Sequence, residues 1–374
     1  MKIGILTFPN SKSYGAALQM LALCSVCKKL GYDTEIINYH NLWMKQEKHI
    51  VSAKGKRANT WMKKKLSGFL HLPMIKGFAR FENQMKKYPA KPIFKKKELP
   101  LIADRYGAVI CGSDQVWNPN ITNYDKSFFL DFCGPETSRI SYAPSFGVEA
   151  LPAAFAEEVK YELDQFAHVS VREYAGQKII RELTGENAKL VVDPTLLLDG
   201  EEWMRHETAY PQACGDYILY YTVRSSQTLW DHCVKLAEKT NMKILRIGSN
   251  IISRQFKKRD GVEYVSDAAP DQWLYLLRNA RYVVTNSFHG TAFAINFKKD
   301  FYVEFSSTAN DRLSNLVKIL KLEDRVLSDG KEIFPVQTDY SETDGILSGL
   351  KEESINFLEQ ALKTVSVKNR KRNA

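Results

Sequence analysis

The sequence contains few cysteines and no long apolar run. Six cysteines in 374 residues are too sparse and too irregularly spaced for a disulfide framework, so we expect a reducing compartment. No stretch approaches the roughly 18 consecutive apolar residues that a membrane-spanning helix needs. The chain starts with a predicted strand, Lys2 to Phe8, rather than with a charged region followed by an apolar one, so no signal peptide is expected. These absences predict a cytoplasmic protein that does not span a membrane.

Familiar cofactor and metal motifs are missing as well. Cys24 and Cys27 form a Cys-x-x-Cys pair, but they fall within an apolar helical pattern that has no second pair, which indicates core packing. The loop from Pro9 to Tyr14 has neither a Walker nor a Gly-x-Gly-x-x-Gly sequence. His, Cys, Asp and Glu residues do not cluster with the spacing of metal ligands. We therefore expect no resident metal and no bound cofactor.

Positive charge is concentrated in one segment. The net charge is +10, and residues Lys45 to Lys97 hold 16 Lys and Arg against Glu47 and Glu82, so the rest of the chain is net negative. Apolar residues spaced by four between Trp61 and Leu72 predict a short amphipathic helix with a basic face. The segment fits an anionic membrane surface or a solvated excursion that packs on its own domain. Nucleic acid is a third alternative, although no nucleic-acid-binding motif accompanies the charge.

Alternating strands and helices predict an α/β fold, and 374 residues exceed what one core usually covers. We expect an N-terminal α/β domain over residues 1–197, including a basic insertion over 45–97, and a C-terminal α/β domain over 198–348. Residues 349–374 are expected to form a helix with a basic tail. The expected strands are Lys2–Phe8, Asp33–Tyr39, Ala108–Cys111, Arg139–Ala143, Lys189–Val192, Tyr217–Val223, Lys243–Ile247, Arg281–Thr285 and Phe301–Glu304. The expected helices include Gly15–Lys29, Pro152–Phe166, Glu173–Leu183, Thr228–Lys239, Pro270–Asn279 and Thr291–Phe297.

Polar residues follow several predicted strands of the first half. Ligands of open α/β sheets bind at the carboxyl ends of the strands, so these residues are candidates for a binding site. The candidates are Tyr14, Gly15, Gly112, Ser113, Asp114, Gln115, Asn118, Arg172 and Asp193. Arg172 lies where a strand meets a helix. An arginine there either forms an ion pair with Asp or Glu, or binds a carboxylate or phosphate of a ligand through its planar guanidinium.

The stretch from Tyr282 to Phe297 places a histidine at the corresponding point of the second half. The β-branched run before Asn286 predicts a buried strand, and the residues after Ser287 predict a packed helix. His289 therefore stands at a strand-to-helix turn, where the free N–H groups of a helix start favour an anion. An imidazole there can pass a proton at neutral pH, whereas the simpler alternative is a histidine satisfied within a helix cap.

Ser287, Phe288, Gly290 and Thr291 flank His289 and belong to the same candidate site. Arg312 follows near the start of another predicted helix, close enough in sequence to converge on His289. Two α/β domains with polar strand ends predict a site in the cleft between them.

Five motifs, taken in order, resemble those of the polysaccharide pyruvyl transferase family. They are Tyr14-Gly15-Ala16-Ala17-Leu18-Gln19, Gly112-Ser113-Asp114-Gln115-Val116-Trp117-Asn118-Pro119, Ser170-Val171-Arg172-Glu173, Val192-Asp193-Pro194-Thr195 and Ser287-Phe288-His289-Gly290. The resemblance spans roughly Met1 to Arg325. The loop from Ser11 to Ser13 departs from the Asn-Tyr-Gly form common in relatives, and the 45–97 segment has no family motif.

The resemblance implies two Rossmann-like domains in a GT-B-like arrangement with an interdomain cleft. It also implies transfer of a pyruvyl group from phosphoenolpyruvate to a sugar of a surface or exopolysaccharide precursor, which forms a cyclic ketal. The family's catalytic histidine and arginine correspond to His289 and Arg172, and Arg312 is the candidate for a further basic residue. Asp114 or Asp193 is expected to position the acceptor.

The residue types suit this chemistry, because phosphoenolpyruvate brings a carboxylate and a phosphate that need fixed positive charge. The acceptor is expected to be a saccharide on a polyprenyl pyrophosphate carrier, which would account for a basic segment resting on the inner face of the membrane. Two alternatives stay open. One is a GT-B glycosyltransferase that uses a nucleotide sugar, and the other is a non-catalytic protein that binds polyanions or lipids.

Overall fold

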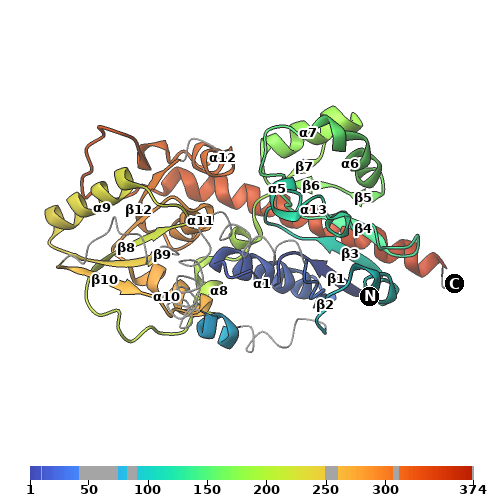
Figure 1. Cartoon of the computed structure of the whole chain (residues 1–374), viewed down its shortest axis with the longest axis horizontal. Helices are drawn as coiled ribbons and strands as arrows, with labels where there is room; N and C mark the ends of the chain where they lie inside the picture. Colours follow the sequence, from blue (N-terminus) through green and yellow to red (C-terminus); the bar gives the residue numbers. More distant parts are fainter. Residues whose placement is uncertain (10, 42–74, 82–90, 249–259, 306–310, 373–374) are drawn as a thin grey trace, which may run out of the picture. The chain divides into compact units, whose positions relative to one another are not determined.

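The computed structural model describes residues 1–9, 11–41, 75–81, 91–248, 260–305 and 311–372 (Figure 1). The chain divides into two compact units, and each is described by itself. The first unit comprises Met1–Lys54, Met85–Leu197 and Ser348–Ala374. The second comprises Gly55–Gln84 and Leu198–Leu347.

The first unit is built on a five-stranded parallel sheet in the order β2-β1-β3-β4-β5. The strands are β1 (Lys2–Leu6), β2 (Asp33–Ile36), β3 (Ala108–Cys111), β4 (Ser138–Ser141) and β5 (Phe166–His168). β3 is buried at every residue, as expected for an apolar strand covered on both faces. The strand order reverses direction between β1 and β3, where Leu6 lies opposite Cys111. This is the topological switch point of the sheet, the place where such folds bind ligands.

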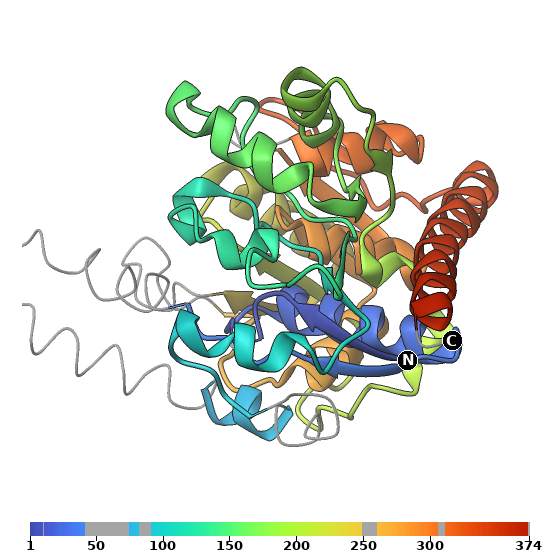
Figure 2. The ribbon, with the colours of Figure 1, turned by 90° about the vertical axis from the view of Figure 1, so that its right-hand side faces the viewer.

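Helices pack around this sheet. The longest are α1 (Tyr14–Lys29), α6 (Ala156–Leu163), α7 (Tyr174–Thr184) and the first-unit part of α13 (Ser341–Arg372). α6 and α7 lie side by side (Figure 2). β6 (Ser170–Val171) and β7 (Lys189–Leu190) form a separate parallel pair, and the Ser354 hydroxyl of α13 accepts from the backbone N–H of Val192, just beyond β7, at 3.0 Å. Short helical turns complete the unit: η2 (Lys96–Glu98), α4 (Pro100–Ala103), α5 (Pro119–Thr122), η3 (Lys126–Phe129), η4 (Ala153–Phe155) and η5 (Pro194–Leu196).

The second unit contains a six-stranded parallel sheet in the order β10-β9-β8-β11-β12-β13. Its strands are β8 (Tyr217–Thr222), β9 (Lys243–Gly248), β10 (Val262–Val265), β11 (Tyr282–Thr285), β12 (Asp300–Glu304) and β13 (Val326–Leu327). Numbered within the unit this order is 3-2-1-4-5-6, which is the Rossmann order. The switch point therefore lies between β8 and β11, where Tyr221 is opposite Thr285.

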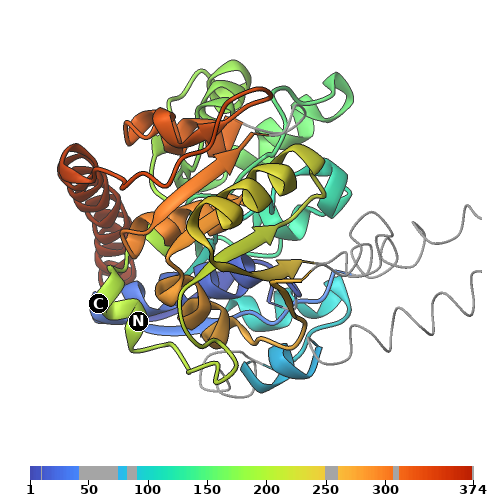
Figure 3. The ribbon, with the colours of Figure 1, turned by 90° about the vertical axis from the view of Figure 1, so that its left-hand side faces the viewer.

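The two faces of the second sheet are covered by different helices. α9 (Gln227–Thr240) covers one face, where Trp230 and Cys233 pack on Tyr220 and Val284 (Figure 3). α10 (Pro270–Asn279) and α11 (Phe288–Asn296) pack against each other, and Trp273 of α10 meets Tyr221 edge to face. The unit also contains α8 (Gly200–Met204), α12 (Asp311–Ile319) and η6 (Glu323–Arg325).

Three expectations about local structure need correction. The helix expected over Pro152–Phe166 is η4 followed by α6, which ends at Leu163 because Phe166 pairs with Arg139 of β4. The helix expected from Thr291 begins earlier, at Phe288, so His289 lies inside its first turn. Strand β10 was missed, since two of its four residues are exposed and it carries little apolar pattern.

The basic insertion was assigned as a whole to the N-terminal domain; its described residues 91–97 lie in the first unit, whereas residues 75–81 belong to the second. Helical residues 75–81 pack on the second unit. The Arg80 guanidinium donates to Gln272 Oε1 at 2.6 Å, and a Cβ on Gly77 would lie 2.6 Å from the carbonyl oxygen of Asp267. The expected amphipathic helix over Trp61–Leu72 lies outside the described residues.

Five of the six cysteines are buried, and Cys214 is exposed. All six are free, and Cys24 and Cys27 are buried in α1. Burial raises the pKa of the Cys24 thiol to about 12, so it is uncharged at neutral pH. Among the helices that the structure describes, none has the length and apolarity required to cross a membrane.

Candidate functional site

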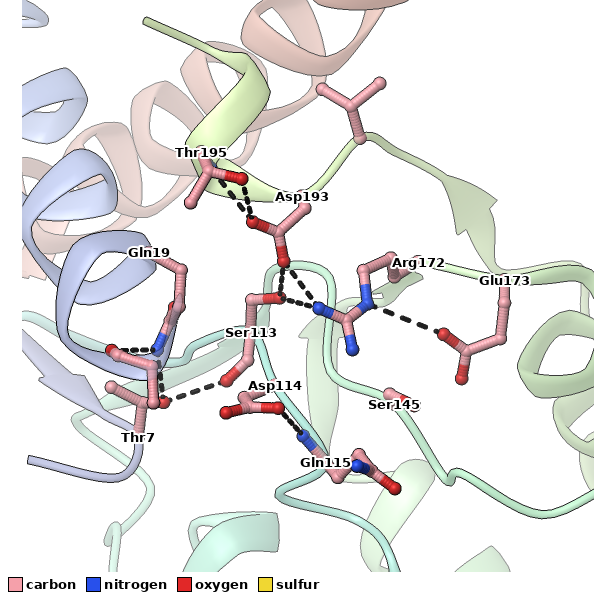
Figure 4. A network of polar contacts seen from close by, with 12 residues as sticks. Thr7, Gln19, Ser113, Asp114, Gln115, Ser145, Arg172, Glu173, Asp193 and Thr195 are labelled. Carbon is pink, nitrogen blue, oxygen red and sulfur yellow. Dashed lines mark hydrogen bonds and ion pairs between the residues drawn. The ribbon is translucent and has the colours of Figure 1, made fainter. Parts of the chain in front are cut away.

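The first candidate site lies at the switch point between β1 and β3. Thr7 follows β1 directly, and its hydroxyl donates to the carbonyl oxygen of Ser113 at 2.8 Å. The Gln19 amide of α1 donates to the Thr7 hydroxyl at 2.9 Å, which ties the first helix to both strand ends (Figure 4). A Cβ on Gly112 would lie 3.3 Å from Cβ of Thr7, so glycine lets the two strand ends approach closely.

A buried ion pair joins this switch point to the neighbouring strands (Figure 4). Arg172 follows β6, and its Nη1 lies 2.5 Å from Oδ2 of Asp193. The same nitrogen lies 3.4 Å from the Ser113 hydroxyl, which itself donates to Asp193 at 2.8 Å. Both charged side chains are almost fully buried, so the ion-pair alternative for Arg172 is present in the structure.

Asp193 is fully engaged by its neighbours. Its Oδ1 accepts from the backbone N–H of Thr195 at 2.9 Å and from the Thr195 hydroxyl at 2.7 Å, while Oδ2 faces Ser113 and Arg172. These four contacts occupy both carboxylate oxygens, and Asp193 is the counter-ion of Arg172.

Carboxylates outnumber the guanidinium in this cluster. Glu173 Oε2 lies 3.7 Å from the Arg172 Nε, and Glu173 is also buried. Burial alone would lower the pKa of Arg172, but the charges of Asp193, Glu173 and Asp114 together raise it. Arg172 is therefore charged, and its positive charge is offset by the surrounding carboxylates.

Asp114 differs from Asp193 in exposure and in backbone conformation. It is half-buried and has φ of 80°, a left-handed conformation that is uncommon for a residue with a side chain. Its Oδ1 accepts from the backbone N–H of Gln115 at 2.8 Å. The carbonyl of Asp114 accepts from the Ser145 N–H on the loop after β4, where Ala143 also has positive φ, 58°. Two such conformations on facing loops are typical of functional sites.

The motif Gly112–Pro119 after β3 contributes residues both to the candidate site and to the hydrophobic core. Val116 and Trp117 are buried, and the Trp117 indole donates to the Phe128 carbonyl at 2.9 Å. Asn118 caps α5 and donates to Gln115 Oε1 at 2.7 Å. A Cβ on Gly147 would lie 2.3 Å from that Gln115 oxygen, so the β4 loop closes directly over these two amides. Tyr14 and Gly15 are buried in the first turn of α1, a little more than one turn before Gln19.

The second candidate site lies at the switch point between β8 and β11. β11 ends at Thr285, whose hydroxyl accepts from the N–H of Ser287 at 3.0 Å. Ser287 caps α11 by accepting from the N–H of Gly290, so His289 is held in the first turn. His289 is 9% exposed, and its ring lies edge to face with Phe288 at 5.2 Å.

Close packing explains the small residues around His289. A Cβ on Gly290 would lie 2.6 Å from the Thr285 hydroxyl and 3.0 Å from the ring of Tyr221. Thr291 is fully buried, and its hydroxyl donates to the carbonyl of Ser287 at 3.1 Å. The start of α11 is thus pressed against the ends of β8 and β11, which fixes the backbone of the histidine.

Asn286 joins the two strand ends of this switch point. Its Oδ1 accepts from the N–H of Val223 at 3.0 Å, and its Nδ2 donates to the carbonyl of Arg224 at 2.9 Å. Arg224 is exposed and is the second residue after β8. Arg312 is partly buried in the first turn of α12, a helix that packs on α11.

The structure therefore groups the predicted residues into two sets. Ser113, Asp114, Arg172 and Asp193 meet in the first unit, whereas Ser287, Phe288, His289, Gly290 and Thr291 form one turn in the second. Sequence reasoning missed Thr7 in the first set and Arg224 in the second, and it named Gln19 and Thr195 within motifs but not as site residues. Arg224 carried one usable signal, since it directly follows the expected strand Tyr217–Val223, whereas Thr7 fell within the expected strand Lys2–Phe8. The roles of the predicted residues in catalysis remain predictions.

Comparison with known proteins agrees with the fold. At 10% identity, the chain is similar to UDP-GlcNAc 2-epimerase from Neisseria meningitidis bound to UDP-GlcNAc, with a TM-score of 0.52 over 98% of this chain and 100% of that chain. It is also similar to UDP-GlcNAc 2-epimerase from Methanocaldococcus jannaschii, at 11% identity and a TM-score of 0.48, over 94% of this chain and 100% of that chain. The heptosyltransferase WaaC of E. coli with ADP-2-deoxy-2-fluoro heptose matches at 11% identity and a TM-score of 0.40, over 82% and 90% of the two chains. At these identities the likeness concerns the fold alone.

The fold and the two switch-point sites define a class of protein: an α/β protein with two Rossmann-like domains of the GT-B type, as the sequence predicted. The family model for polysaccharide pyruvyl transferase matches residues 14–303, which is most of the chain. The chain therefore belongs to the polysaccharide pyruvyl transferase family, a family of transferases in polysaccharide biosynthesis. Comparison with curated protein sequences gave no significant match.

Replacing Arg172 by alanine tests whether the buried ion pair stabilises the first unit. The change leaves the Asp193 carboxylate buried without its counter-ion, so we expect the free energy of unfolding to fall by about 3 kcal/mol or more in urea denaturation. Arg181→Ala, on the exposed side of α7, is the matched control and should change it by less than about 0.5 kcal/mol. In the double variant with Asp193→Asn, the loss should be smaller than the sum of the single losses. Wild-type stability of Arg172→Ala would contradict the structural role.

Proposed function

We propose that this protein transfers a pyruvyl group from phosphoenolpyruvate to two hydroxyls of a sugar and thereby forms a cyclic ketal. The observation that carries the proposal is the contrast between the two switch points. The first holds hydroxyl and carboxylate groups suited to a polyol, whereas the second holds an imidazole at a helix start, suited to an anion.

In the proposed reaction, C3 of the enol takes a proton and C2 becomes an oxocarbenium-like carbon. A sugar hydroxyl attacks C2 and loses its proton, and the C2–O bond to phosphate breaks. A second hydroxyl then attacks C2, loses its proton and closes the ring. Of the two protons that the hydroxyls lose, one balances the proton gained at C3 and the other leaves with the phosphate.

His289 is the proposed general acid on phosphoenolpyruvate or on its departing phosphate. Its buried place at the start of α11 supports this role, because the positive end of a helix and partial exclusion of water both strengthen contacts with an anion. Arg312, in the first turn of neighbouring α12, is proposed to add fixed positive charge.

Asp114 is the proposed acceptor-side base, and this choice over Asp193 rests on geometry. Asp193 is buried and bonded to Thr195, Ser113 and Arg172, whereas Asp114 is half-buried on a constrained turn. Arg172 is proposed to offset the charges of the neighbouring carboxylates when the anionic donor approaches. The remaining predicted residues, Gly112, Gln115, Asn118, Tyr14 and Gly15, are proposed to shape the acceptor pocket.

The family implies a polysaccharide acceptor, and we propose that this acceptor is linked to a lipid carrier at the inner face of the membrane. The described end of the basic segment supports this. Lys91, Lys95 and Lys97 are exposed beside Phe94, which is 46% exposed, and Leu101, which is 79% exposed. Lysines next to exposed apolar side chains suit an anionic lipid surface.

Incubation of the protein with phosphoenolpyruvate and a panel of galactosides, followed by phosphate measurement, tests the activity itself. We expect acceptor-dependent phosphate release, and His289→Ala should lower its turnover by about 10²-fold or more because a general acid is lost. His206→Ala, another histidine of the second unit, is the control with intact turnover. Thermal stabilisation by a UDP or GDP sugar but not by phosphoenolpyruvate would instead support a glycosyltransferase. Stabilisation by neither ligand would point to a non-catalytic protein.

Asp114→Asn tests the acceptor-side base with little backbone disturbance, since asparagine tolerates a left-handed conformation. The amide cannot take up a proton, so kcat for acceptor-dependent phosphate release should fall by about 10²-fold. Asp104→Asn, exposed in the same unit, should have no effect. Full turnover of Asp114→Asn would exclude Asp114 as the base.

Sedimentation with vesicles tests the membrane surface. The protein should pellet with phosphatidylcholine vesicles that contain phosphatidylglycerol, and salt should release it, because each lysine near an anionic surface contributes about 1 kcal/mol. Phe94→Ser with Leu101→Ser should weaken binding, while Tyr161→Ser, on 65% exposed Tyr161 of α6, should not. Absence of binding at low salt would remove the membrane part of the proposal.

A further inference from the structure

The loop after β8 is held against the start of the histidine helix by one side chain. Asn286 accepts from the backbone N–H of Val223 at 3.0 Å and donates to the carbonyl of Arg224 at 2.9 Å. A side-chain amide that bonds to two consecutive residues fixes both the position and the direction of that backbone. The backbone of Arg224 is therefore held in a fixed position where the chain leaves the sheet.

That point lies within the switch point of the Rossmann sheet. β8 and β11 are neighbours with Tyr221 opposite Thr285, so Arg224 lies three residues beyond one member of this pair and His289 four residues beyond the other. Both residues are therefore on the carboxyl edge of the sheet. Two helices also begin there, α9 with Ser226 as its cap and α11 with Ser287 as its cap. Two helix starts add partial positive charge to the same edge.

The charge balance of the two units favours an anion on this edge rather than at Arg172. In the first unit the guanidinium of Arg172 is bonded to Asp193 and lies beside Glu173. On the second edge, the carboxylate of Glu304 at the end of β12 is bonded to the Ser226 hydroxyl at 2.8 Å. Arg224 is exposed and follows β8 at the same carboxyl edge of the sheet as the buried His289.

We propose that Arg224 binds an oxyanion of the donor substrate and that Asn286 is the positioning residue that aims it. This inference rests on the proposed function for the identity of the donor, since phosphoenolpyruvate carries both a carboxylate and a phosphate. A guanidinium can hold either group through two parallel hydrogen bonds. Its place beside the start of α11 sets that oxyanion next to His289, where a proton must be delivered.

Binding measurements on the full chain test the assignment without relying on turnover. The affinities for phosphoenolpyruvate, inorganic phosphate and pyruvate are measured by titration calorimetry for the wild type and for Arg224→Ala. We expect Arg224→Ala to weaken binding of phosphoenolpyruvate by about 10-fold or more, as for loss of a charge-assisted bidentate contact. Arg224→Lys should recover part of the affinity, because lysine keeps the positive charge but cannot form two parallel hydrogen bonds. Arg205→Ala, on an exposed arginine at the end of α8, is the control and should bind as the wild type does.

Asn286→Asp provides the matched test of positioning. It keeps the oxygen that accepts from Val223 but replaces the amide that donates to Arg224 by a second oxygen. We expect weaker binding of phosphoenolpyruvate than in the wild type, and no further loss when Asn286→Asp is combined with Arg224→Ala. A purely structural role for Asn286 would lower the melting temperature and leave the two affinity losses additive, which would overturn its assignment as a positioning residue.

The three ligands separate this inference from the proposed function. If only inorganic phosphate binds, and does so through Arg224, the oxyanion site stands and the proposed donor is wrong. If Arg224→Ala weakens the binding of pyruvate alone, the guanidinium binds the carboxylate of the donor. If it weakens the binding of inorganic phosphate alone, the guanidinium binds the phosphate of the donor. Equal binding of phosphoenolpyruvate by wild type and Arg224→Ala overturns the inference and leaves the proposed function intact. Failure of the wild type to bind any of the three overturns both.

Discussion

Reversal of strand order within a parallel sheet is the constraint on which both candidate sites depend. In the first unit the strands that follow β1 diverge, with β2 on one side and β3 on the other. In the second unit β9 and β11 flank β8 in the same way. Right-handed crossovers then send the following helices to opposite faces, which leaves a crevice at the carboxyl ends of the central strands. Thr7 and Ser113 occupy this position in one unit, and Asn286 and His289 occupy it in the other.

The two switch points have opposite electrostatic character. In the first, the carboxylates of Asp193, Glu173 and Asp114 surround one guanidinium, so negative groups outnumber the positive one. In the second, two helix starts, His289 and Arg224 favour negative charge. This division is also why Asp193, although part of a family motif, has the contacts of a scaffold residue.

Sequence reasoning reached most of the strands and the candidate histidine because these rest on local patterns. Val283 and Val284 followed by Asn286 and Ser287 indicate a strand, a turn and a cap wherever they occur. The strand over Val262–Val265 was missed because half of its residues face solvent, and the helix over Pro152–Phe166 was overextended because pairing of Phe166 with β4 is a long-range contact. The described helix 75–81 was assigned to the wrong unit for a similar reason, since its contacts with Asp267 and Gln272 lie almost 200 positions away.

By itself the sequence determined the class of fold, the alternation of elements and the residues that follow each strand, since hydrophobic period and cap chemistry act over a few positions. It left open whether Arg172 pairs with a carboxylate or binds a ligand, and which of Asp114 and Asp193 positions the acceptor. Tertiary structure decided the pairing of Arg172 with Asp193 and the full engagement of Asp193, and it brought Arg224 to the helix of His289 through Asn286. These outcomes depend on strand order, because the partners are distant in sequence and only the packing of parallel strands brings them within hydrogen-bonding distance.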